Sequence, residues 1–122
     1  MRSRPAKFAI LDTSVYIDNF RTGHFAFRLL QAPYVIRCSA VVVHELLRGA
    51  RPGIERRFVT DLAKRCQVVT PTEAHWMAAA DILSNMRKRE HYDAAKVLEL
   101  AFDVLIALTA RSIGATLITS NQ

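Results

Sequence analysis

Residues 7–20, KFAILDTSVYIDNF, join a short apolar run to an acid and two hydroxyls. The apolar run at residues 8–11 predicts a strand that is buried on both faces, and Asp12 follows it directly. Two interpretations of Asp12 remain open. Its carboxylate can cap the helix that follows, or it can belong to a ligand site, because ligands bind at the carboxyl ends of strands in open α/β sheets.

The composition indicates one folded domain that spans residues 1–122. Half of the chain is apolar (51%), and only 4 Gly and 4 Pro interrupt it. The formal charge of +6 favours a polyanionic partner. Cys38 and Cys66 are too few for a disulfide scaffold and lack metal-ligand spacing, so we expect free thiols in a reducing compartment. The chain has no apolar run long enough for a signal peptide or a membrane span, and we expect a soluble cytoplasmic protein.

Strand and helix patterns alternate along the chain. Strands are expected at residues 8–11, 34–40, 67–71 and 115–119. Helices are expected from about residue 14, and at 25–31, 41–50, 54–66, 72–90 and 93–114, the last as one helix or two. This alternation predicts an α/β fold with a parallel sheet of about four strands and helices on both faces.

A second acid lies in CSAVVVHELLRGA, residues 38–50. Ser39 is a predicted N-cap, which places Glu45 in the second turn of the helix, on the side of Val41 and Val42. Glu45 is therefore either part of a site among apolar residues or a partly exposed acid at the edge of a helix. His44 is expected at the surface or in packing, because no second ligand has metal-site spacing.

A third acid interrupts LELAFDVLIALTAR, residues 98–111. Residues 100–108 are apolar except for Asp103, which predicts a helix that is buried on nearly all sides. An unpaired buried carboxylate costs several kcal/mol, so we expect a cation nearby. Alternatively, the helix restarts at Phe102 or Asp103, and the acid lies at its N-terminus. Glu99 is expected to face water or to join Asp103.

Three acids thus follow three segments of an α/β pattern, each among apolar residues. Carboxylates without accompanying His or Cys suit a hard divalent cation such as Mg2+ or Mn2+. Such a metal could activate a water and neutralise a phosphate.

Four motifs occur in an order that resembles the PIN domain family, specifically its VapC toxin branch: AILDTSVYID, SAVVVHELLRGA, DVLIALTAR and GATLITSN. The resemblance implies a single PIN-like domain and a Mg2+- or Mn2+-dependent ribonuclease that hydrolyses RNA phosphodiester bonds. It also implies roles for particular residues. The implied metal-site and catalytic residues are Asp12, Glu45 and Asp103, with a hydroxyl from Thr13 or Ser14 and a polar group from Asn121.

The resemblance also implies partners. A VapC-type toxin acts on RNA, binds a cognate antitoxin and commonly forms a homodimer. Basic residues that could follow the RNA backbone are Arg48, Arg51, Arg87, Lys88 and Arg89. We expect an antitoxin helix to bind in a groove between the helices that end in HELLRGA and MRKRE.

One departure from the family concerns the C-terminus. The family often carries an acid a few residues after the position of Asn121, followed by a helix and a strand, whereas this sequence ends at Gln122. We therefore expect the C-terminal end of the family fold to be missing, and the strand at residues 115–119 to form an exposed edge.

Two other classes of function fit part of the sequence. A phosphotransferase of the haloacid-dehalogenase type would use Asp12 as nucleophile, but it needs a second acid where this chain has Ser14. A non-catalytic RNA-binding module or adaptor explains the positive charge. It does not explain three carboxylates among apolar residues, because carboxylates repel phosphate unless a cation lies between them.

Overall fold

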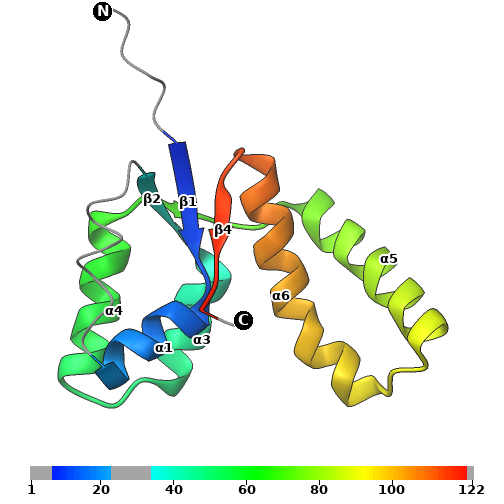
Figure 1. Cartoon of the computed structure of the whole chain (residues 1–122), viewed down its shortest axis with the longest axis horizontal. Coiled ribbons are helices and arrows are strands. Elements are labelled where there is room, and N and C mark those ends of the chain that lie inside the picture. The colour runs from blue at the N-terminus through cyan, green and yellow to red at the C-terminus, as the bar shows by residue number, and fades with distance from the viewer. Residues whose placement is uncertain (1–6, 23–33, 121–122) are drawn as a thin grey trace, which may run out of the picture.

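The computed structural model describes residues 7–22 and 34–120, and within them it has four parallel strands (Figure 1). The strands are β1 (Lys7–Leu11), β2 (Tyr34–Ser39), β3 (Val68–Val69) and β4 (Thr116–Ile118), in the order β3-β2-β1-β4. This sheet confirms the α/β prediction. The helix expected at residues 25–31 lies outside the described residues.

Strand β1 lies in the interior of the sheet, where Ala9 pairs with Ile36 on one side and Thr116 on the other. Ala9, Ile10 and Leu11 are all buried. Because successive side chains of a strand point to opposite faces, three buried residues in a row mean that both faces of β1 are covered. Strand β4 is an edge of the described sheet, as the sequence predicted.

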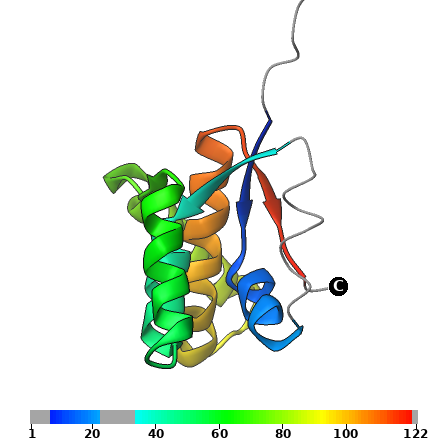
Figure 2. The same ribbon diagram turned by 90° about the vertical axis from the view of Figure 1, so that its left-hand side faces the viewer.

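Five helices are described: α1 (Thr13–Thr22), α3 (Ala40–Gly49), α4 (Ile54–Arg65), α5 (Glu73–Glu90) and α6 (Ala94–Ser112). Figure 2 shows α4 and α6 beside the strands, and Figure 1 shows α5 on the far side of α6 from the sheet. Helix α6 contacts both α3 and α5. The groove predicted between the ends of α3 and α5 is therefore wrong, because α6 lies between these two helices.

Local signals set the ends of several helices. The Ser39 hydroxyl accepts hydrogen bonds from the N–H groups of Val41 and Val42, which confirms it as the N-cap of α3. The Asp93 carboxylate caps α6 through the N–H of Lys96 at 2.8 Å. Helix α6 then runs without a break to Ser112, so the alternative of a restart at Phe102 or Asp103 is wrong.

The core holds one buried thiol beside a buried phenol. Cys38 and Tyr16 are 3% and 1% exposed. Burial, followed by the neighbouring thiol of Cys66, raises the pKa of Cys38 to about 12. Both cysteines are free thiols.

Among the described residues, no helix is long and apolar enough to cross a membrane.

Candidate functional site

Asp12 lies where β1 and β4 end side by side. Its N–H donates to the carbonyl of Ile118 at 2.8 Å, which continues the pairing of the two strands. One carboxylate oxygen, Oδ1, accepts from the N–H of Thr13 at 2.7 Å, at the start of α1. The other oxygen, Oδ2, lies 3.2 Å from the hydroxyls of Ser14 and Thr119. The two interpretations of Asp12 are thus compatible: one oxygen serves the helix start, and the other faces a polar cluster.

The polar cluster joins the first and last strands. The Ser14 and Thr119 hydroxyl oxygens are 3.2 Å apart, and the N–H of Ser120 donates to Ser14 Oγ at 3.3 Å. Ser14 was expected here from the sequence, whereas Thr119 was not. The available signal was the strand order itself, since Thr119 follows β4 as Asp12 follows β1, and parallel neighbours end at the same edge of a sheet.

Asp103 faces the same cluster from α6. A cavity of about 260 Å³ is lined by both Asp12 and Asp103, together with Ile106, Leu117 and Thr119. Partial burial, and secondly the negative charge of Asp12, raise the pKa of Asp103, while Lys96 acts in the opposite direction. Two carboxylates therefore repel one another across this cavity.

The full burial that was predicted around Asp103 is wrong. Glu99, Asp103 and Ala107 are all exposed, and they recur every four residues on one side of α6. This side faces solvent because α6 buries its other sides against the sheet and α5. Glu99 lies 3.8 Å from Lys96 in an exposed ion pair, which agrees with the expectation that it faces water.

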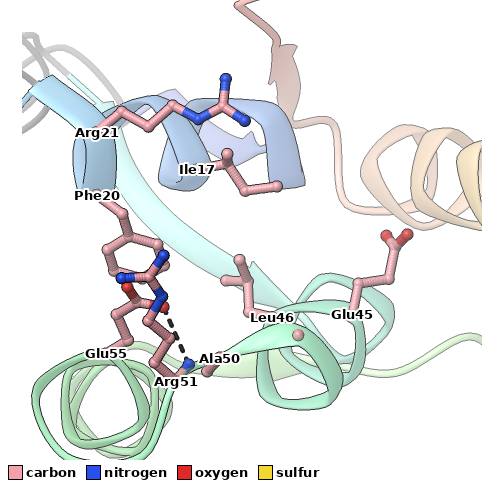
Figure 3. Close-up of a pocket in the computed structure, with 9 residues that line it drawn as sticks. Ile17, Phe20, Arg21, Glu45, Leu46, Ala50, Arg51 and Glu55 are labelled. Atoms are coloured by element: carbon pink, nitrogen blue, oxygen red, sulfur yellow. Dashed lines mark hydrogen bonds between the residues drawn. The ribbon is translucent and has the colours of Figure 1, made fainter.

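Glu45 lies next to this cluster rather than in it. It is half-buried on α3, and its Oε1 accepts a 2.9 Å hydrogen bond from the hydroxyl of Thr13. It lines a separate pocket, and Figure 3 shows its carboxylate at the opposite end of that pocket from Glu55. Within residues 7–22 and 34–120, no group of three His, Cys, Asp or Glu side chains could hold one metal ion. The described side chains therefore do not include the three-carboxylate metal group that was expected. Glu45 is hydrogen-bonded to Thr13, which directly follows Asp12.

The oxygens near Asp12 nevertheless fit a hard cation. Asp12 and Asp103 present carboxylates to one cavity, and Thr119 adds a hydroxyl. Mg2+ keeps several waters and usually takes one or two carboxylates from the protein, with phosphate oxygens of a substrate completing its shell. Mn2+ accepts the same oxygen donors. Glu45 could then act on this site through Thr13.

The basic candidates separate into two groups. Arg48 lies over the ring of Phe102 at 5.7 Å, and His44 packs edge-on against the same ring, so both belong to the contact of α3 with α6. Arg51 lines the pocket beside Glu45.

Arg87, Lys88 and Arg89 are exposed in the last turn of α5, beyond α6 (Figure 1). Asn121 lies outside the described residues.

A family model for the PIN domain matches residues 9–122. The chain belongs to the PIN domain family. This match includes Asp12, Glu45 and Asp103, and also β4 with Thr119 directly after it. No curated protein is significantly similar to the chain in sequence.

Several solved structures share the fold of this PIN domain. A chain of VapBC-1 from nontypeable Haemophilus influenzae is 24% identical with a TM-score of 0.66, over 93% of this chain and 87% of that one. A chain of DNA-bound VapBC from Salmonella typhimurium is 19% identical, with a TM-score of 0.64, over 96% and 88%. A chain of VapBC2 from Rickettsia felis, bound to a promoter DNA fragment, is 18% identical, with a TM-score of 0.67, over 93% and 87%.

Proposed function

We propose that this PIN domain is a metal-dependent ribonuclease and the toxin component of a toxin–antitoxin system. The observation that carries the proposal is the placement of Asp12 and Asp103 on one cavity at the carboxyl ends of β1 and β4. In the described part of the chain, neither acid forms an ion pair with Lys or Arg. A divalent cation would offset their repulsion and let a phosphate approach.

When bound, Mg2+ or Mn2+ would supply water activation and neutralise charge on the phosphate. The residues of the chain have separate tasks around it. Asp12 and Asp103 would hold the cation through carboxylate oxygens, and the hydroxyls of Ser14 and Thr119 would orient water or phosphate beside Asp12 Oδ2. Thr13 fixes the carboxylate of Glu45 at the margin of the site. Asn121 is a further polar residue that we propose for the site, from the resemblance to VapC toxins alone.

The toxin assignment rests on the family and on the fold. The chain is a PIN domain, and structures of three VapBC systems share its fold over more than nine-tenths of its length. This likeness supports an antitoxin partner. A homodimer of the chain is proposed from the resemblance to VapC toxins alone. Gel filtration with light scattering tests the homodimer, for which a concentration-independent monomer mass would be the contradictory result.

The decisive assay for the enzyme measures cleavage of single-stranded RNA. Wild-type protein should cleave it in Mg2+ or Mn2+ and lose activity in EDTA. Asp12→Asn should lose activity, whereas Asp61→Asn, an exposed acid on α4, is the matched control and should retain it. Metal-independent cleavage, or equal cleavage by Asp12→Asn, would contradict the proposal.

One observation favours an alternative function, a non-catalytic RNA-binding module. No three-acid group exists among the described residues, and a PIN fold with a degenerate site could still bind RNA through its positive charge. The same assay separates the two functions. The alternative predicts RNA binding without any metal-dependent cleavage.

A further inference from the structure

A second cavity adjoins the carboxylates. It has a volume of about 450 Å³ and lies between α1, α3 and the start of α4 (Figure 3). This size falls within the roughly 300–1,000 Å³ that is typical of small-molecule sites. We refer to it as the α1–α3–α4 pocket. The metal-binding role proposed for Asp12 and Asp103 does not explain this pocket.

The pocket has an apolar floor with one aromatic ring. Ile17 and Phe20 contribute from α1, and Leu46 contributes from α3. Phe20 is half-buried, and its ring packs edge-to-face against Phe58 with centroids 5.4 Å apart and an interplanar angle of 82°. The ring is therefore held in one orientation by the core and remains partly open to a ligand.

The rim carries two cations and two acids, but their hydrogen-bonding states differ. Glu45 accepts a hydrogen bond from the hydroxyl of Thr13. Glu55 accepts one from the backbone N–H of Arg51 at 3.0 Å. Across the described ranges, the guanidinium groups of Arg21 and Arg51 form no ion pair. Each guanidinium has five N–H donors and no acceptor. The hydrogen-bonding groups that remain available on the rim are therefore donors, which suit an acceptor-rich, anionic ligand.

Glu45 connects the pocket to the proposed active site. It forms one wall of the α1–α3–α4 pocket, and Thr13, to which it is hydrogen-bonded, is covalently next to Asp12. A polymer that places one phosphate at Asp12 would therefore bring its next unit toward the pocket.

We propose that the α1–α3–α4 pocket binds a nucleotide of single-stranded RNA beside the cleaved bond, with its base on Phe20 and its phosphate facing Arg51. The inference rests on the proposed ribonuclease function and adds a subsite for its substrate. Single-stranded RNA is recognised through unstacked bases that lie on aromatic or guanidinium planes, and this pocket offers both.

The test measures RNA affinity separately from cleavage. Fluorescence anisotropy of a labelled single-stranded RNA of about ten nucleotides gives the affinity in Mg2+, in an Asp103→Asn background that prevents cleavage. Three variants address the pocket: Phe20→Leu for the stacking surface, Arg51→Gln for the phosphate contact and Gly49→Leu for the volume. Arg65→Gln, an exposed residue in the last turn of α4, is the matched charge control.

Each variant has a distinct expected result. Phe20→Leu should weaken binding at least about fivefold with an unchanged salt dependence, because it removes base stacking. Arg51→Gln should lower the slope of log K against log salt by about 0.7, the value for one lost phosphate contact on a single strand. Arg65→Gln should retain the affinity and the slope of the background protein.

Gly49 allows the pocket to be filled without disturbing the fold. Gly49 lines the pocket, and a Cβ placed on it would meet no other atom within 4 Å. Gly49→Leu should therefore fold normally and weaken RNA binding about tenfold, on the scale of one lost base contact. Gly49→Ala adds only the Cβ and should weaken binding less. Thermal melts of both variants verify the fold.

The outcomes separate this inference from the proposed function. Unchanged RNA affinity in Gly49→Leu and Arg51→Gln would overturn the subsite, even if the wild-type protein cleaves RNA. Weaker binding by the pocket variants, together with no cleavage by the wild type, would support the subsite and refute the enzyme. Unchanged RNA affinity with an altered oligomeric mass in light scattering would assign the pocket to a contact between copies, against the inference.

Discussion

The hydroxyl of Thr13 donates a 2.9 Å hydrogen bond to Glu45 across 32 positions of sequence. The N–H of the same Thr13 donates to Asp12 at 2.7 Å. One residue at the start of α1 thus contacts both an acid of the candidate metal site and the acid on α3. Through this hydrogen bond Glu45 would act on the proposed metal site, and this leads to the first prediction.

Thr13→Val should lower the rate of RNA cleavage by about tenfold. This factor corresponds to a little over 1 kcal/mol, the scale of losing one hydrogen bond to a carboxylate. Valine keeps the shape of threonine but cannot donate to Glu45, so the carboxylate loses its fixed position. Thr13→Ser keeps the hydroxyl and should retain most of the activity. Initial rates in Mg2+ measure both, and equal rates for Thr13→Val and wild type would refute the positioning role.

Asp103→Asn should lower RNA cleavage by about 100-fold or more, the scale of removing one preorganised electrostatic group. The amide keeps the shape of the side chain but removes the charge that holds a cation. In EDTA the variant should melt at a higher temperature than wild type, because it relieves repulsion with Asp12. A lower melting temperature in EDTA would instead indicate a structural role for the carboxylate.

The stability of the metal-free protein should depend on pH through Asp103. Partial desolvation and the charge of Asp12 raise the pKa of Asp103 in the folded state. The folded protein therefore binds more protons than the unfolded one between the ordinary pKa, about 4, and the raised pKa. Stability relative to Asp103→Asn should therefore fall as the pH rises through this window and stay level above it. Denaturant titrations in EDTA at a series of pH values measure this difference. If the stability of wild type relative to Asp103→Asn instead increased as the pH rises, the prediction would be refuted.

The two cysteines should differ in reactivity. Cys38 is 3% exposed and burial raises its pKa to about 12, so little thiolate is present near neutral pH. Iodoacetamide at pH 8 should therefore modify the half-buried Cys66 before Cys38 in the folded protein. Peptide mass spectrometry after timed alkylation measures the order. Faster modification of Cys38 would mean that β2 is not packed as described.

Much of the fold could be predicted because its signals are local. An apolar run that ends at Asp12 specified β1, and Ser39 specified the start of α3 through hydrogen bonds only two and three residues away. The position of Asp12 at the end of the sheet followed from the same pattern. These features depend on neighbours in sequence, which a single sequence displays directly.

The features that could not be predicted depend on which elements are neighbours in space. The apolar sequence around Asp103 suggested full burial, but one side of α6 faces solvent because α5 covers only part of it. The turn of Glu45 toward Thr13 is a contact between α3 and α1 that no spacing encodes. The groove expected beside α3 was misplaced because α5 packs against α6, a tertiary contact that the sequence pattern does not specify.

Asp12 and Asp103 are proposed to hold a divalent cation, and a crystal soaked in Mn2+ would show whether they do. Anomalous scattering should show an ion in the cavity lined by these two acids and Thr119, with oxygen ligands at about 2.0–2.6 Å or joined to it through waters. Asp103→Asn crystals treated in the same way should lack the ion. A wild-type cavity without Mn2+ at millimolar concentration, or an ion bound elsewhere on the chain, would contradict the account.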